Sequence, residues 1–94
     1  MNAESRSVWD DLVGQVVVLD VSSPYVIIGR LDRCQGEWVV LGDVDVHDLR
    51  DTATSRETYL VNSRLHGVHA NRRTAWVRLH EVVSLSRLED VLAE

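Results

Sequence analysis

The chain has 94 residues, of which 45% are hydrophobic and 27% are charged, so it can bury one modest core and is too apolar for a disordered protein. Its formal net charge of −5 argues against broad contact with nucleic-acid phosphates, although residues 59–94 carry a small positive excess. No apolar run is long enough to span a bilayer and residues 1–4 lack the start of a signal peptide, so a cytoplasmic protein without membrane contact is expected.

The first half of the chain predicts a short helix followed by three strands. Ser7 and Asp10 have the spacing of a helix cap, and Gly14 is a suitable C-terminal stop. The hydrophobic period then becomes two, which predicts strands over residues 16–21, 25–34 and 38–46, with turns at 22–24 and 35–37. Gly29 inside the second strand indicates a sharp bend, of the kind that a small barrel needs to close.

A long segment, residues 46–73, separates the third strand from the next apolar stretch. Loops above ~12 to 15 residues without structure are uncommon, so this insertion is expected to contain an element of its own. Residues 54–57 have capping-box spacing with Thr54 at the cap, which predicts a helix over residues 55–66 that stops at Gly67. Its inner contacts are expected to be Leu60, Val61, Leu65 and Val68.

The C-terminal part of the chain predicts two more strands and a last helix. Residues 77–85 are typical of two short strands joined by a tight polar turn. Residues 86–89 repeat the capping-box spacing, and Leu88, Val91 and Leu92 then predict a short amphipathic helix. We expect residues 1–94 to form a single domain.

Two stretches of this sequence together resemble the two signatures of the Sm-like proteins. The first signature corresponds to residues 12–19, 29–31 and 39–45, which match its order of apolar, Gly and Asp positions to within one residue. The second, apolar-Arg-Gly-x-x-Val-x-x-apolar, corresponds to residues 77–85, with Leu79 in place of the Gly. The chain therefore resembles a divergent, bacterial-type member of this family.

The resemblance implies a mainly β, Sm-like, SH3-type fold: a five-stranded bent β-barrel with an N-terminal helix, a helical insertion between strands 3 and 4, and a short C-terminal helix. It also implies a cyclic homo-oligomer, because family members pair the fourth strand of one subunit with the fifth strand of the next. The exposed strand edges of a bent open sheet favour the same assembly. The size of the ring does not follow from the sequence.

The resemblance also points to a site for RNA. In RNA-binding members, an Asp and an Asn in the turn between the second and third strands bind a base together with the Arg of the second signature. That Arg is Arg78 here, but the turn is one residue shorter and Trp38 stands where the Asn is expected. Trp38 can stack on a base or serve as a core or subunit contact. Arg78 can bind a phosphate or pair with the acidic first half of the chain.

Three further residues complete the candidate nucleic-acid contacts. His80 belongs to the same turn as Arg78. Arg72 and Arg73 follow Asn71, and the three residues offer a small anion site if their backbone N–H groups converge. The alternative is a turn between helix and strand with solvated charges.

No arrangement of residues predicts catalysis, a metal site or a cofactor. The four His residues lack the paired spacing of a zinc site, and no Ser has the His and Asp partners of an activated nucleophile. Cys34 has no second Cys to pair with and is expected to be a buried thiol. We therefore expect a protein that is not an enzyme.

Two functions remain open on the sequence alone. The first is binding of RNA or single-stranded nucleic acid by a ring, with contacts from Arg78, His80, Trp38, Arg72 and Arg73. The second is a scaffold or adaptor ring that has lost the RNA site and binds a protein partner through the inserted helix. The acidic charge, Trp38 and Leu79 favour the second function, whereas Arg78 and the more basic second half favour the first.

Overall fold

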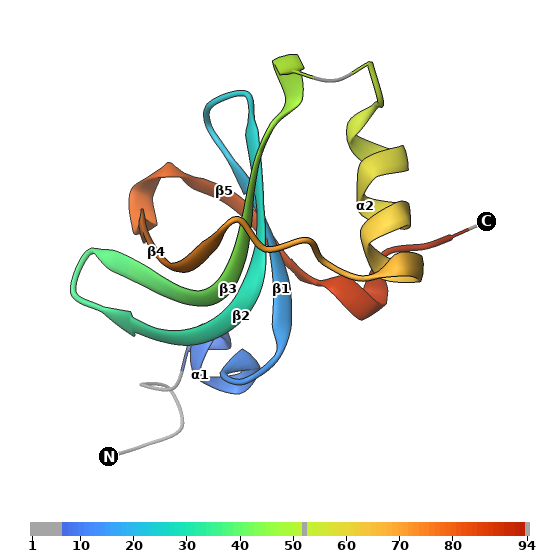
Figure 1. The fold of residues 1–94 in the computed structure, drawn as a ribbon. Helices are drawn as coiled ribbons and strands as arrows, with labels where there is room; N and C mark the ends of the chain where they lie inside the picture. The colour runs from blue at the N-terminus through green and yellow to red at the C-terminus, as the bar shows by residue number, and fades with distance from the viewer. Residues whose placement is uncertain (1–6, 52, 94) are drawn as a thin grey trace.

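The chain folds into a strongly bent antiparallel sheet of five strands in the order β4-β3-β2-β1-β5, with one helix before the sheet and one inserted into it (Figure 1). A computed structural model describes residues 7–51 and 53–93. The helices and strands are α1 (Val8–Leu12), β1 (Val16–Val21), β2 (Tyr25–Gln35), β3 (Trp38–Asp48), α2 (Arg56–His66), β4 (Arg72–Arg78) and β5 (Val82–Arg87). Single 3₁₀ turns occupy Leu49–Asp51, Leu79–Glu81 and Leu88–Asp90. The predicted fold class is confirmed.

The expected bend at Gly29 is present in β2. The register between β2 and β3 shifts between Ile28 and Arg30. A Cβ atom on Gly29 would lie 3.2 Å from Val44 Cγ2 and 3.3 Å from Leu41 Cβ, closer than side chains normally pack. Glycine is therefore favoured where β3 packs closely on β2.

The sheet buries apolar side chains on both of its faces. The inner core is formed by Val17, Leu19, Ile27, Leu31, Val39, Leu41, Val44 and Val77. On the opposite face Val18, Val26 and Ile28 are covered by Leu60 of α2. This explains why β1 and β2 contain continuous apolar runs, since strands covered on both sides do not alternate.

The inserted helix begins one residue later than predicted. Its cap is Ser55, whose hydroxyl oxygen accepts a hydrogen bond from the Thr58 N–H at 3.2 Å, so the assignment of the cap to Thr54 is wrong. The helix ends at Gly67, as predicted, where φ is +97° and the N–H donates to Ser63 O at 3.0 Å. Leu65 was expected to face inward, but it is 55% exposed.

The C-terminal helix is shorter than predicted. Strand β5 continues through Ser86 and Arg87, because these residues pair with Val18 and Val17 of β1. Only one 3₁₀ turn, Leu88–Asp90, follows, and Leu92 is 84% exposed.

A buried carboxylate ties the inserted helix to the sheet. Asp45 on β3 is 7% exposed and accepts hydrogen bonds from the Tyr59 hydroxyl on α2 and from Asn71 Nδ2 at 3.2 Å. Asn71 also pairs with the backbone of Val46, accepting from its N–H at 3.0 Å and donating to its carbonyl at 3.0 Å. The His47 ring stacks on Tyr59 at a centroid distance of 3.9 Å. These contacts fix both ends of the insertion on β3.

The Asp45–Tyr59 contact predicts a dependence of stability on alkaline pH. Burial, assisted by the hydrogen bond to Asp45, raises the pKa of Tyr59 above its ordinary value of 10.0. The unfolded chain then loses the phenol proton first, so stability falls as the pH rises above that value. We expect Tyr59→Phe to be less stable near neutral pH by ~1 to 2 kcal/mol, because Asp45 loses a donor, and to lose less stability between neutral and alkaline pH. Urea unfolding at several pH values measures both effects, and parallel curves for the two proteins would contradict them.

Candidate nucleic-acid interface

Two turns that are far apart in the sequence meet at one end of the sheet. Strands β3 and β4 run antiparallel, which places Trp38, the first residue of β3, opposite Arg78, the last residue of β4. The Leu79 N–H donates to the Glu37 carbonyl at 2.8 Å and so joins the β2–β3 turn to the β4–β5 turn. The pairing of these two strands therefore brings two of the predicted site residues together.

Trp38 and Arg78 form a cation–π pair at this junction. The Arg78 guanidinium carbon lies 4.8 Å from the centroid of the Trp38 ring. Arg78 Nη1 is also 3.8 Å from Glu37 Oε1, while half of the Arg78 side chain remains exposed. Trp38 is only partly buried and belongs to neither core cluster. The pair thus presents an aromatic ring and a cation at the surface, a combination suited to a nucleobase and its phosphate.

Leu79 packs against the inner core, where the family signature has Gly. A leucine at this turn therefore contributes apolar contacts to the fold. We expect Leu79→Gly to lower the free energy of unfolding by ~2 to 3 kcal/mol, because it removes a packed side chain and adds backbone freedom to the unfolded chain. Chemical denaturation of this variant, with Leu79→Met as a size-matched control, measures the loss. Unchanged stability together with tighter oligonucleotide binding would show instead that Leu79 only crowds the site.

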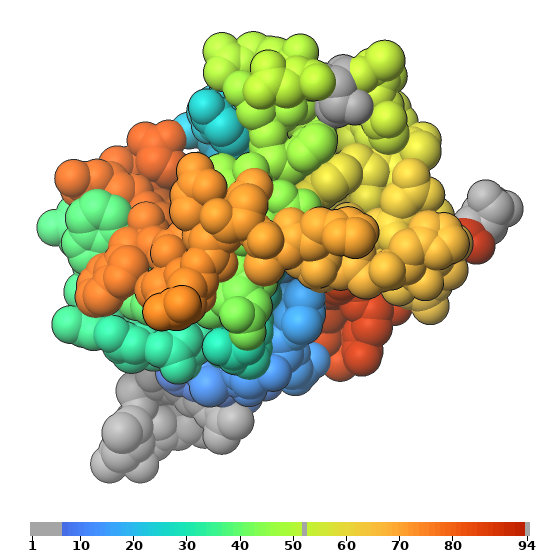
Figure 2. Space-filling model, in the orientation of Figure 1, coloured from blue at the N-terminus to red at the C-terminus, as the bar shows by residue number. Residues whose placement is uncertain are grey.

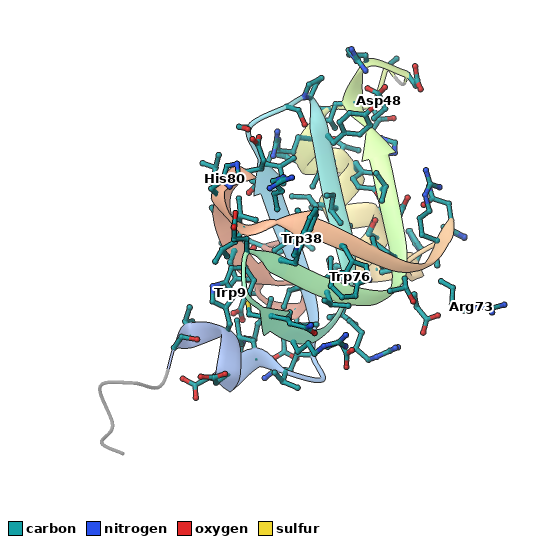
Figure 3. The ribbon with its side chains drawn as sticks, turned by 90° about the vertical axis from the view of Figure 1, so that its left-hand side faces the viewer. Trp9, Trp38, Asp48, Arg73, Trp76 and His80 are labelled. Carbon is teal, nitrogen blue, oxygen red and sulfur yellow. The ribbon has the colours of Figure 1, made fainter. Side chains whose placement is uncertain are left out.

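His80 lies on the same turn as Arg78 but is set apart from Trp38 (Figure 3). Its side chain is 63% exposed, and its Nε2 atom is 3.6 Å from Glu81 Oε2. Glu81 in turn accepts a hydrogen bond from the Ser22 hydroxyl. His80 is thus available to solvent, next to an acidic side chain.

Arg72 and Arg73 begin β4 and therefore lie at the end of the strand that is remote from Arg78. The Asn71 N–H is not free to bind an anion, because it donates to Val44 O at 2.8 Å. Arg72 Nη1 donates to the Asn71 carbonyl at 3.1 Å. Figure 3 shows Arg73 and His80 on opposite sides of the view, with Trp38 between them. The five predicted residues therefore do not form one compact cluster.

A cleft beside β4 nevertheless connects three of the five predicted residues. Its volume is about 570 Å³. Trp38, Arg72 and Arg78 line it, together with Trp76, whereas His80 and Arg73 do not. Apolar side chains of β1 to β4 complete the lining: Val21, Ile27, Val46, Ala75 and Val77. The lining of the cleft is thus largely apolar, and Arg72 and Arg78 add a cationic group from each end of β4.

Two residues that sequence reasoning missed extend the Trp38–Arg78 pair. Trp76 is 48% exposed, and its ring centroid is 6.3 Å from that of Trp38, with 73° between the planes. The Arg33 guanidinium carbon lies 5.4 Å from the Trp76 ring. The sequence offered one clue, because Trp76 directly precedes the stretch predicted to form strands, residues 77–85, and side chains two residues apart on a strand, such as Trp76 and Arg78, share a face.

Cys34 differs from its prediction, because it is exposed rather than buried. Strand β2 runs on through Gln35, which carries Cys34 beyond the core. No group of three or more His, Cys, Asp and Glu side chains that could hold a metal occurs in residues 7–51 and 53–93. In the same part of the chain, no helix has the length and apolar character needed to cross a membrane.

The fold of this chain is similar to that of a solved structure of the Sm protein from Pyrococcus abyssii in complex with a uridine heptamer. The two structures align with a TM-score of 0.58 over 93% of this chain and 99% of that one, at 15% sequence identity. No protein-family model and no curated protein sequence matches the chain. The similarity thus lies in the fold rather than in the sequence, and the chain has the Sm-like fold.

Proposed function

We propose that this chain forms a ring and binds single-stranded RNA, as a divergent relative of the Sm proteins. The observation that carries the proposal is the Trp38–Arg78 pair, held at the junction of the two turns by the Leu79–Glu37 hydrogen bond. The similar protein from Pyrococcus abyssii was solved with a uridine heptamer, which supports the same class of ligand for this fold.

The chemistry of the pair favours stacking over base-specific recognition. An indole ring offers a π-face that every base can cover, and a guanidinium can bind a phosphate oxygen or stack on a base. The amide side chain that would read a base edge is replaced by Trp38. We therefore expect modest discrimination between oligo-U and oligo-A.

The local charge supports contact with phosphates although the whole chain is acidic. Residues 30–43 and 71–80, which contain most of β2, β3 and β4, hold five Arg and three acidic residues. The remaining residues hold five Arg and twelve acids. Because only a few phosphates would be neutralised at such a surface, the affinity should fall moderately with salt.

The free edges of the sheet support the ring. Strands β4 and β5 each pair with a single neighbour in the described part of the chain. The cleft beside β4 is lined by apolar side chains, and β5 exposes 71% of Val83. A second copy of the chain that adds its β5 to this β4 would cover both features, and head-to-tail pairing of this kind closes into a ring.

The direct test is binding of fluorescently labelled oligo-U and oligo-A to the purified protein at low and moderate salt. Measurable affinity for single strands at low salt, weaker at moderate salt and weaker still for a duplex of equal length, is the expected result. Equal affinity for the duplex, or no binding at low salt, would overturn the proposal.

A second candidate function is a scaffold ring that binds a protein through the inserted helix. The supporting observation is a hollow of about 560 Å³ between the end of α2 and the sheet, lined by Arg64, Leu65 and Val16 among others. Leu65 and Val16 are 55% and 39% exposed there. Absence of RNA binding, together with a partner whose binding is lost in Leu65→Asp, would favour this function.

A further inference from the structure

Four side chains on the outer surface of β2, β3 and β4 form a row that we call the Trp–Arg ladder: Arg33, Trp76, Trp38 and Arg78. The two rings meet edge to face at 6.3 Å, and each has an Arg guanidinium over it, at 5.4 Å for Arg33 and 4.8 Å for Arg78. The row thus consists of two neighbouring rings with a cation at each end.

The ladder lies on the face of the sheet that points away from the inner core. Val39 and Val77 belong to that core, and successive side chains of a strand point to opposite faces, so their neighbours Trp38, Trp76 and Arg78 project outward. The inserted helix covers Val18, Val26 and Ile28 elsewhere on this side of the sheet. In the space-filling view, atoms of the β4 region lie at the surface (Figure 2). A ligand therefore has access to the ladder.

We propose that Trp76 and Arg33 form a second stacking platform, so that each subunit binds two successive bases of one strand. This inference rests on the proposed function and adds to it a site beyond the junction of the turns. An indole that is 48% exposed on a strand is an unusual use of a large apolar side chain, and such exposed aromatic groups are typical of binding surfaces.

The angle between the two indole rings determines whether a single-stranded or a duplex nucleic acid can bind. Two bases that lie on rings inclined by 73° cannot remain stacked on each other. Bases in a duplex are held parallel, whereas single strands can splay their bases onto aromatic side chains. The ladder therefore fits an unpaired strand and excludes a duplex.

The charges of the ladder favour a ligand that carries phosphates over an uncharged peptide that binds to aromatic rings. Arg33 is held by Asp32, and Arg78 lies 3.8 Å from Glu37 Oε1. These acids hold the guanidinium groups beside the rings, where each can meet the phosphate of the base that covers its ring. A proline-rich peptide would gain from the rings but would bring no anion to the two guanidinium groups.

The first test is the affinity of Trp76→Ala for oligo-U. Stacking is worth ~1 to 3 kcal/mol per base, so the affinity should fall roughly 5- to 150-fold. Leu92→Ala is the matched control, because it removes another exposed large apolar side chain, 84% exposed, beyond the last strand. Trp76→Phe should restore most of the affinity, since a phenyl ring still stacks. Unchanged affinity in Trp76→Ala would overturn the inference.

The second test follows each ring separately by fluorescence. The chain has three Trp residues, so Trp9→Phe combined with Trp38→Phe leaves Trp76 as the only indole. Addition of oligo-U should quench its emission, whereas a proline-rich peptide should not. Trp9→Phe combined with Trp76→Phe reports on Trp38 in the same way.

The outcomes separate this inference from the proposed function. Quenching of Trp38 without quenching of Trp76 would leave the proposed function in place and overturn the second platform. Absence of quenching at both rings would overturn both. A lower oligomer mass of Trp76→Ala in light scattering would place Trp76 in a subunit contact and would also overturn the second platform.

Discussion

Val83→Asp is expected to convert the protein from an oligomer to a folded monomer. Val83 is 71% exposed on β5 and is skipped where the pairing with β1 shifts register, so the isolated subunit should tolerate a charge there. In a ring, the same position would be covered by β4 of the next subunit, where an unpaired carboxylate costs several kcal/mol. Because every subunit carries the change, every interface would be weakened.

Light scattering at micromolar concentration measures this effect, and circular dichroism shows whether the subunit remains folded. Leu92→Asp is the control, since Leu92 is 84% exposed but lies beyond the last strand. Val77 is a less suitable position although it is on β4, because it belongs to the inner core and a charge would unfold the subunit itself. A native protein that is already monomeric, or a Val83→Asp protein of unchanged mass, would contradict the ring.

Arg78→Ala is expected to weaken binding of a long oligo-U by more than the loss of one contact. A hydrogen bond to a charged group is worth ~1.5 to 3 kcal/mol, or roughly 10- to 150-fold in affinity. In a ring, one strand would contact Arg78 of several subunits, so the loss should grow with oligonucleotide length. The melting temperature should change little, because half of the side chain is exposed and its ion pair with Glu37 is long, at 3.8 Å.

Arg64→Ala provides the matched control for charge, because Arg64 is an exposed Arg on α2, away from the ladder. Fluorescence anisotropy with oligo-U of increasing length measures the affinities. A loss that is equal for short and long oligonucleotides would show that each strand contacts a single subunit. Normal affinity with a lowered melting temperature would make Arg78 a structural residue and would favour the scaffold function.

The strands could be predicted from the sequence because their hydrophobic period and turn residues are local properties. Gly29 and Gly67 were also interpreted correctly, since a close approach of strands and a positive φ each favour glycine. The cap of α2 was placed at Thr54 rather than Ser55, because two adjacent hydroxyl residues offer almost the same spacing.

The candidate site was only partly predictable, because its residues come from different strands. The match to the second signature identified Arg78, and alignment with the first drew attention to Trp38, but the contact between them depends on the register of β3 and β4. Arg33 and Trp76 carry no motif and become neighbours only when β2, β3 and β4 are paired. Leu79 shows the opposite case, since a departure from the family signature proved to be a packing residue.

The apolar cluster between α2 and the sheet limits how this fold can vary. In a minimal barrel the segment between β3 and β4 is a connection that evolution or a protein engineer can shorten freely. Here Leu60 of α2 covers Val18, Val26 and Ile28, each at most 1% exposed, and Asp45 anchors the helix through Tyr59. A protein that lost the α2 segment would need polar side chains at those three strand positions. It would also need a replacement for Asp45. The helix and the strand positions beneath it are thus expected to change together, whereas the ladder uses other positions of β2, β3 and β4.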